Sequence, residues 1–129
     1  MDNTRNMKAW TWTEATFDAA HQLPLHEGKC RRLHGHTYKV VLGIEVEIDN
    51  TTGMAVDFGV LQDFLHIHAV APYDHKLLND VLFGRQPTAE NIALEILGQA
   101  VRVFKCPARV RVHETPSCWV EVRSNGRPA

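Results

Sequence analysis

Two long stretches of the chain alternate between apolar and polar residues, which is the pattern of a half-buried β-strand. The first covers residues 9–21, is rich in Thr and aromatic residues, and places its odd-numbered residues on one face. The second covers residues 34–48 and places its even-numbered residues on one face. These inward faces carry Ala15, Phe17, Ala19 and His21 in the first stretch, and His34, His36, Tyr38, Val40, Leu42, Ile44, Val46 and Ile48 in the second.

Two helices are predicted after these strands. Asp57 is a candidate N-cap for a helix that runs to about Val70, and Pro72 is expected to end it. Pro87 and Thr88 open a second helix, which has an apolar stripe at helical spacing. This stripe consists of Ala89, Ile92, Ala93, Ile96, Leu97, Ala100 and Val101.

The alternating pattern returns in residues 108–114 and 118–123, with a turn at 115–117 between them. The predicted order is β-β-α-α-β-β, which is typical of an α+β fold with a four-stranded antiparallel sheet and two helices on one face. Such a sheet has two open edges, and proteins usually blunt these edges or pair them with another chain. We therefore expect the chain to oligomerise through its sheet edges.

Composition narrows the class of protein. At 129 residues we expect a single domain, with residues 1–6 and 124–129 as flexible ends. The formal net charge of −1 argues against broad nucleic-acid binding, which needs a positive surface. No apolar run approaches the roughly 20 residues that cross a bilayer, and residues 1–8 are too polar for a signal peptide. Three cysteines are too few for a disulfide framework, so we expect a cytoplasmic protein without a membrane partner.

Histidine is the unusual residue of this sequence, with eight in the chain and four of them between positions 21 and 36. His34 and His36 are two residues apart in a predicted strand, so their side chains point to the same face. His21 ends the preceding strand, and the three imidazoles can converge if the two strands pair. Three neutral nitrogen donors with a fourth position open are what a catalytic zinc ion requires. The alternative is that these imidazoles only pack or form hydrogen bonds.

Cys30 is a candidate active thiol. It lies four residues before His34, and its neighbours in the sequence are Lys29, Arg31 and Arg32. Cations near a thiol stabilise the thiolate, which is the reactive form. The alternative is a packed cysteine in a solvated basic loop.

Two further positions are candidates for the site. Glu114 follows Val110 and Val112 on the inward face of the third strand, where a carboxylate is costly unless it has a partner. A guanidine-like or 2-aminopyrimidinone ligand would suit it, because a carboxylate accepts two parallel N–H bonds. If the strand has already ended, Glu114 is solvated instead. The adjacent residues Asp74 and His75 form a candidate acid/base pair in a predicted loop.

A set of short motifs gives the chain a family resemblance. In order, the motifs are FDAAH at 17–21, Cys30 followed by HGH at 34–36, VDF at 56–58, Asp74-His75 with Leu78-Asn79, PTAEN at 87–91 and ETP at 114–116. Over about residues 10–123 the chain resembles the 6-pyruvoyl tetrahydropterin synthase / 6-carboxytetrahydropterin synthase family. The resemblance implies the tunnelling fold (T-fold), in which trimers close a barrel, two trimers stack as a homo-hexamer, and active sites lie between subunits.

The resemblance also implies a substrate and a set of reacting residues. The substrate is the small-molecule pterin 7,8-dihydroneopterin triphosphate, and the cofactor is Zn²⁺. Cys30 transfers a proton, with Asp74 and His75 as its acid/base partners. The zinc ligands are His21, His34 and His36.

The remaining implied roles concern substrate binding. Glu114 anchors the pterin ring through its 2-amino and N3–H groups, and Thr88 and Glu90 frame the pterin pocket. In addition, we expect basic residues beside the reactive thiol to help recruit the triphosphate. These are Lys29, Arg31 and Arg32.

The family has two enzymatic branches, and the compact length of this chain favours one of them. This branch is the 6-carboxytetrahydropterin synthase of queuosine (7-deazapurine) biosynthesis, which releases acetaldehyde and triphosphate. The alternative is a 6-pyruvoyl tetrahydropterin synthase, a triphosphate lyase of tetrahydrobiopterin-type biosynthesis. A second alternative is a non-catalytic module of the same fold that binds zinc and a pterin.

Overall fold

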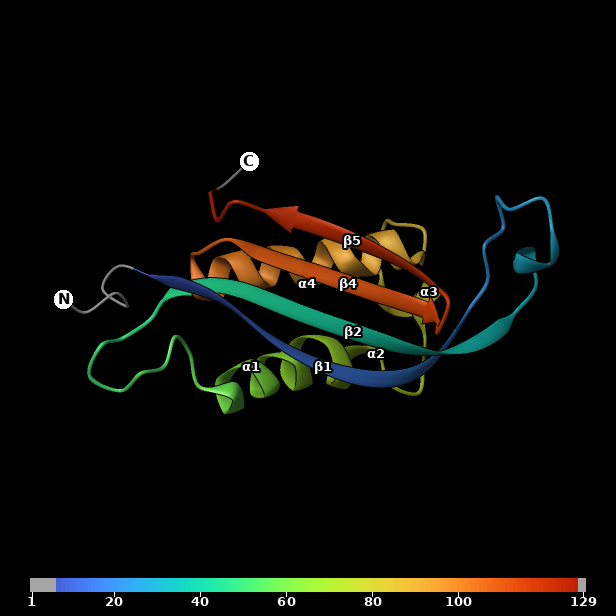
Figure 1. Cartoon of the computed structure of the whole chain (residues 1–129). Helices are drawn as coiled ribbons and strands as arrows, with labels where there is room; N and C mark the ends of the chain where they lie inside the picture. The colour runs from blue at the N-terminus through green and yellow to red at the C-terminus, as the bar shows by residue number, and fades with distance from the viewer. Residues whose placement is uncertain (1–6, 128–129) are drawn as a thin grey trace.

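The computed structural model describes residues 7–127, and its central feature is one five-stranded sheet (Figure 1). The strands lie side by side in the order β3-β1-β2-β4-β5. The β1–β2, β2–β4 and β4–β5 pairs are antiparallel, whereas β1 and β3 are parallel, so the sheet is mixed. The strands span Lys8–His21 (β1), His34–Glu47 (β2), Lys76–Leu77 (β3), Ala108–Thr115 (β4) and Cys118–Ser124 (β5).

The sheet differs from the prediction by one strand. Lys76 and Leu77 form β3, which pairs in parallel with Ala19 and Ala20 of β1. Two residues are too few to show the alternation that reveals a strand, which needs about 4–8 residues. The four long strands and the α+β class are confirmed, but the purely antiparallel four-stranded sheet is corrected to a mixed one.

The longer helices cover one face of this sheet, as predicted. Figure 1 shows α1 and α4 behind the same face, with the other face left uncovered by helices. The side chain of Asp57 caps α1 by accepting the N–H of Gly59 at 2.8 Å. The helical segments are α1 (Phe58–Leu65), the π-helix η2 (His66–Val70), α2 (Ala71–Tyr73), α3 (Leu78–Val81) and α4 (Ala89–Phe104).

The sequence predicted that Pro72 ends the first helix, and the structure corrects this prediction. Helical turns continue through η2 and α2 as far as Tyr73. The N–H of Ala71 bonds to the carbonyl of His66, five residues back. This wider π turn accommodates a proline, which has no N–H to donate to the regular helical pattern.

The core lies between the sheet and the helices. Phe17 of β1 stacks on Tyr38 of β2 with 5.0 Å between ring centroids, and Tyr73 of α2 closes over Phe17 at 5.5 Å. These rings are almost completely buried and form the floor beneath the end of β1. None of the helices within residues 7–127 is long and apolar enough to span a membrane.

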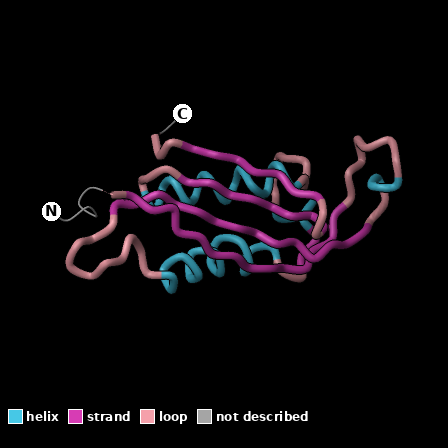
Figure 2. The backbone as a smooth tube through the Cα atoms, in the orientation of Figure 1, coloured by secondary structure: helices cyan, strands magenta, loops and turns pink. Residues whose placement is uncertain are grey.

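Two loops extend from opposite ends of the sheet (Figure 2). One follows β1 at residues 22–33 and contains the short 3₁₀ helix η1 (Lys29–Arg31), and the other follows β2 at residues 48–57. Ser124, which we expected in a flexible end, is the last residue of β5. Residues 1–6 and 128–129, which belong to the same expected ends, lie outside the described residues.

Gly43 provides a test of the close packing on the uncovered face of the sheet. A Cβ at this position would lie 2.5 Å from carbons of the Trp12 ring. We predict that Gly43→Ala lowers the free energy of unfolding by about 1–3 kcal/mol, because the indole must move. Urea denaturation, followed by tryptophan fluorescence, measures this change.

Gly98 is the matched control for this substitution. It lies in the exposed part of α4, and a Cβ there would meet nothing within 4 Å. Gly98→Ala should raise the free energy of unfolding by about 0.5–1 kcal/mol, because alanine loses less backbone entropy in a helix. Equal effects of the two substitutions would contradict the close contact at Trp12.

Candidate metal centre

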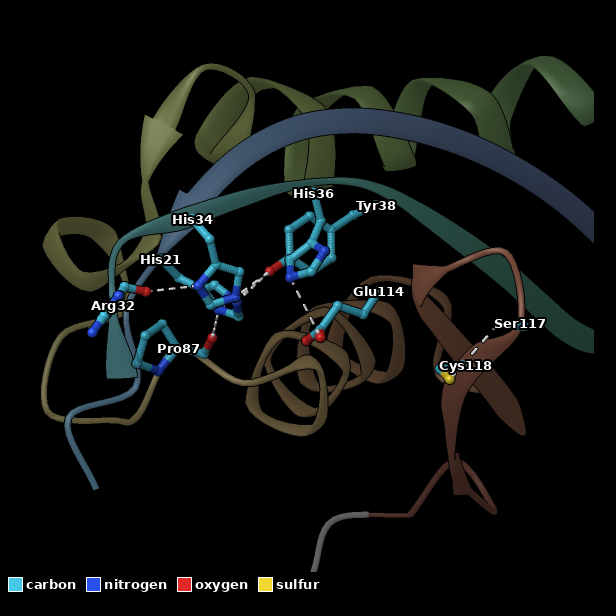
Figure 3. Close-up of polar contacts among 9 residues, drawn as sticks. All are labelled: His21, Arg32, His34, His36, Tyr38, Pro87, Glu114, Ser117 and Cys118. Atoms are coloured by element: carbon cyan, nitrogen blue, oxygen red, sulfur yellow. Dashed lines mark hydrogen bonds and ion pairs between the residues drawn. The ribbon is translucent and has the colours of Figure 1, made fainter. Parts of the chain in front are cut away.

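The pairing of β1 with β2 brings three histidines together at one end of the sheet. His21 lies directly opposite His34, and Ala19 lies opposite His36, so the imidazoles share the inward face. The Nε2 atoms of His21 and His34 are 3.0 Å apart. One nitrogen from each of the three rings lies within 4.8 Å of the others, a separation that one metal ion could bridge (Figure 3). The convergence predicted from the sequence is therefore confirmed.

Backbone carbonyls fix the protonation of two of these rings. The carbonyl oxygen of Pro87 lies 2.7 Å from Nδ1 of His21, and that of Arg32 lies 2.7 Å from Nδ1 of His34. A carbonyl oxygen can only accept, so each Nδ1 carries the hydrogen and each neutral ring keeps its Nε2 lone pair free. Two lone pairs that face each other at 3.0 Å repel unless a cation lies between them. A metal ion held by both Nε2 atoms would remove this repulsion.

His36 supplies a third donor atom. Its Nε2 is buried and has no hydrogen-bond partner among the described residues. Burial lowers the pKa of His36, although the nearby carboxylate of Glu114 opposes this shift and the other two imidazoles reinforce it. The lowered pKa favours the neutral ring, and a buried nitrogen that forms no hydrogen bond is what a metal ion would satisfy.

The chemistry of the donor set fits a zinc-type ion. Three neutral imidazoles suit zinc and its neighbours in the first transition row, and three protein ligands leave a fourth position open. The carbonyls behind His21 and His34 are the kind of outer partner that holds a ligating ring in orientation. Below the site, Tyr38 is fully buried with its hydroxyl 3.3 Å from Nδ1 of His21. Burial raises the pKa of Tyr38, so it stays a neutral phenol.

Glu114 lies beside this centre. Its Oε1 is 3.4 Å from Nε2 of His36, and its side chain is 30% exposed to solvent. The β4–β5 pairing is irregular between His113 and Thr115, yet Glu114 still points to the face that carries His36 (Figure 3). The carboxylate is not a member of the group of donor atoms that could share one metal ion, which consists of the three histidines.

Asp74 and His75 form an ordered pair at the edge of the sheet. Asp74 accepts the N–H of Asp18 at 2.9 Å, and its other oxygen lies 2.9 Å from Nδ1 of His75. The N–H of His75 donates to the carbonyl of Asp18 at 2.6 Å, and the backbone of His75 is left-handed with φ of 59°. The imidazole of His75 is 80% exposed and lines, with His36, one cleft of about 600 Å³.

The other predicted site residues are not members of the donor group formed by the three histidines. Cys30 is half-buried in η1, within the loop that projects past the end of the sheet, and the donor group does not include it. The hydroxyl of Thr88 caps α4 by accepting the N–H of Asn91 at 3.2 Å. Glu90 is exposed in the first turn of the same helix.

The sequence did not reveal three groups that shape the site. Two of them are the carbonyls of Pro87 and Arg32, which are backbone atoms and leave no side-chain signature. The third is Asp18, whose backbone holds both Asp74 and His75. Asp18 is part of the FDAAH motif, which was the available signal.

The fold and the site together define the class: an α+β protein of the tunnelling fold with a three-histidine donor set at the end of its sheet. The family model described as "6-pyruvoyl tetrahydropterin synthase" matches residues 11–125. The chain belongs to the 6-pyruvoyl tetrahydropterin synthase family.

Curated relatives and solved structures agree with this assignment. The chain is 44% identical over 92 residues to "6-carboxy-5,6,7,8-tetrahydropterin synthase" of Synechocystis, covering 68% of this chain and 71% of the relative. It is 32% identical over 129 residues to the protein of the same name from Rickettsia bellii, covering 82% and 94%. The solved 6-pyruvoyl tetrahydropterin synthase of Caenorhabditis elegans superposes with a TM-score of 0.78 at 25% identity, covering 92% of this chain and 96% of that one. The Plasmodium vivax enzyme has the same fold, with a TM-score of 0.79 at 21% identity over 93% and 99% of the two chains.

The contacts of Asp74 predict a measurable pH dependence of stability. The Asp18 N–H, and then His75, lower the pKa of Asp74 below its ordinary value of 3.8. Because the pKa of Asp74 is lower in the folded state than in the unfolded state, its ionised carboxylate stabilises the fold above about pH 4. This stabilisation disappears as the pH falls through the folded-state pKa. Below about pH 4, the free energy of unfolding should therefore fall more steeply in the parent than in Asp74→Asn.

Urea denaturation between about pH 3 and pH 6 measures this difference. Asp63→Asn, at an exposed position in α1, is the control and should follow the parent. A constant offset between the parent and Asp74→Asn over the whole range would mean that the Asp18 and His75 contacts do not stabilise the ionised carboxylate.

Proposed function

We propose that this chain is a zinc-dependent 6-carboxy-5,6,7,8-tetrahydropterin synthase. In this reaction 7,8-dihydroneopterin triphosphate and water give 6-carboxytetrahydropterin, acetaldehyde and triphosphate, as a step of queuosine (7-deazapurine) biosynthesis. The observation that carries the proposal is the three-histidine donor set in a chain whose relatives bear this name at 30–44% identity. The enzyme would be a carbon–carbon lyase.

His21, His34 and His36 would hold the zinc ion through their Nε2 atoms. A zinc ion bound in this way supplies Lewis acidity to oxygen atoms of the substrate. The protein contributes the geometry, because the carbonyls of Pro87 and Arg32 fix the tautomers of two of the rings. The hydrogen-bonded rings need not reorient when the metal binds.

Glu114 would anchor the pterin ring beside the metal. Its carboxylate lies 3.4 Å from His36 and borders a cleft of about 350 Å³ that Thr115 and Pro116 also line. A carboxylate in this position can accept the 2-amino and N3–H groups of a pterin as two parallel hydrogen bonds. The ring would then lie at a fixed distance from the three histidines, which is what orienting a reacting side chain requires.

Cys30, Asp74 and His75 would move the protons. The carboxylate of Asp74 holds Nδ1 of His75, so the Nε2 atom of that ring is left to exchange a proton with substrate. The Cys30 thiol would act as the second proton-transfer group. Cys30 lies in the loop beyond the end of the sheet, whereas His75 lies beside β1, so we propose that the complete site forms between neighbouring subunits of a homo-hexamer.

A second candidate function is that of a 6-pyruvoyl tetrahydropterin synthase. It is favoured by the description of the matching family model and by the name of the Caenorhabditis elegans structure. The two functions share the substrate but differ in the product, because only the carboxy-forming reaction releases acetaldehyde.

A turnover assay distinguishes these functions directly. Purified, zinc-loaded protein is incubated with 7,8-dihydroneopterin triphosphate, and acetaldehyde is followed together with the mass of the pterin product. Acetaldehyde and 6-carboxytetrahydropterin in equal amounts are expected. A 6-pyruvoyl product without acetaldehyde would replace the proposed function with the second candidate. Zinc and pterin binding without any turnover would indicate a non-catalytic module.

The metal ligands can be tested by substitution. His34→Ala should abolish both zinc binding and activity, because it removes one of the three nitrogen donors and two imidazoles are too few to hold the ion. His66→Ala, at an exposed histidine of η2, is the control and should retain about one zinc ion per chain. Metal analysis that finds full zinc in His34→Ala would remove His34 from the ligand set.

Cys30 and Glu114 should separate catalysis from binding. Cys30→Ala should bind zinc and neopterin almost normally but lose turnover by roughly 10²–10⁴-fold, since a positioned acid or base contributes about this much. Glu114→Gln should mainly weaken binding, by about 2–3 kcal/mol, because an amide cannot accept two parallel N–H bonds. Calorimetric titration and single-turnover assays measure the two effects. Unchanged pterin affinity in Glu114→Gln would show that Glu114 is not the anchor.

The proposed assembly has its own test. β5 is one edge of the sheet, and β1 forms the other edge over the residues that β3 leaves unpaired. Light scattering should therefore give a mass several times that of the 14.6 kDa chain, with six chains expected. A monomer at micromolar concentration would contradict a site shared between subunits.

A further inference from the structure

A basic cleft lies in the loop between β1 and β2, outside the metal centre. The cleft has a volume of about 680 Å³ and sits in the segment that projects past the end of the sheet (Figure 1). All of its lining residues are exposed to solvent. They are Glu27, Gly28, Lys29, Arg31 and Arg32.

Local hydrogen bonds give this loop a defined shape. The N–H of Leu23 donates to the carbonyl of Cys30 at 2.9 Å, which closes the base of the loop. The N–H of Gly28 donates to Nδ1 of His26 at 2.8 Å, and the N–H of Arg32 donates to the carbonyl of Lys29 at 3.1 Å. The basic residues therefore project from a short hydrogen-bonded turn, not from an extended chain.

The three cations of the cleft form no ion pair within residues 7–127. By contrast, several basic residues of the sheet form ion pairs. Arg111 and Arg123 both pair with Glu121, and Lys39 pairs with Glu14. Glu27 is the one carboxylate that lines the cleft, so the lining carries a net charge of about +2 at neutral pH. The whole chain has a net charge of −1, so this positive charge is local.

Arg32 links this cleft to the candidate metal centre. The carbonyl of Arg32 accepts the hydrogen bond from Nδ1 of His34 at 2.7 Å, and Figure 3 shows Arg32 beside the triad. One residue thus contributes its side chain to the cleft and its backbone to the orientation of a metal ligand. A ligand bound at the metal can extend a charged arm toward this cleft.

We propose that Lys29, Arg31 and Arg32 bind the triphosphate of the substrate, an inference that rests on the proposed function. A triphosphate is a compact polyanion, and arginine offers paired N–H donors that match phosphate oxygens. A lysine ammonium adds a compact charge with three donors. A small positive cleft on a chain of net negative charge suits such a small polyanion better than the extended backbone of a nucleic acid.

The test compares two unreactive oxidised pterins that differ only in the phosphate arm: neopterin triphosphate and neopterin. Binding of each to the zinc-loaded protein is measured by calorimetric titration. The test variant is the triple substitution Lys29→Gln, Arg31→Gln and Arg32→Gln, which keeps the backbone carbonyl that holds His34. Arg102→Gln is the matched control, because it removes an exposed positive charge from the last turn of α4. Zinc content is measured in every sample.

The parent should bind neopterin triphosphate on the order of 100-fold more tightly than neopterin, and the triple variant should lose most of this preference. Its affinity for neopterin should stay within about twofold of the parent, and Arg102→Gln should behave as the parent does. Raising the salt concentration should reduce the preference in the parent and have little effect in the triple variant.

Three results would overturn the inference. The first is a triple variant that keeps the preference for the triphosphate. The second is a variant that loses zinc or neopterin binding as well, since the loop would then serve only to support the site. The third is an equal loss in Arg102→Gln, which would indicate a general charge effect. Failure of the parent to bind either pterin would instead contradict the proposed function itself.

Discussion

The hydrogen bonds between two backbone carbonyls and two imidazoles are the interactions on which the rest of the site depends. Pro87 and Arg32 each hold an Nδ1–H group, and this forces the Nε2 lone pairs of His21 and His34 to face each other at 3.0 Å. Such an arrangement is unfavourable without a cation. The fold therefore places these donor atoms together before any ligand is present, and a bound metal ion would relieve the repulsion.

Three separate parts of the chain are required to produce this geometry. The antiparallel register of β1 and β2 sets His21 against His34, and the buried stack of Phe17 on Tyr38 holds that register below the site. The segment just before α4 supplies the Pro87 carbonyl, and the loop between β1 and β2 supplies the Arg32 carbonyl. Because each contact comes from a different part of the chain, the candidate metal centre also joins the segment before α4, the sheet and the loop. We expect metal binding and the folding of this end of the molecule to be coupled for the same reason.

Much of this arrangement could be predicted from the sequence because it follows from strand periodicity. The alternation over residues 34–48 places His34 and His36 on the buried face, and the pairing of two adjacent strands then brings His21 to them. The same reasoning puts Glu114 on the inward face of β4. What could not be predicted lacks a periodic signal. β3 has only two residues, the π turn before Pro72 is a local adjustment, and the two carbonyls that orient the histidines belong to the backbone.

X-ray absorption spectroscopy at the zinc edge of the metal-loaded protein tests the central claim most directly. We expect three imidazole nitrogens at about 2.0–2.1 Å, a light oxygen or nitrogen ligand in the fourth position, and no sulfur. The multiple scattering from the rings should fit coordination through Nε2, as the carbonyl contacts at Nδ1 of His21 and His34 require. A sulfur atom at about 2.3 Å, or rings bound through Nδ1, would contradict the account, because the thiol of Cys30 or a different tautomer would then define the site.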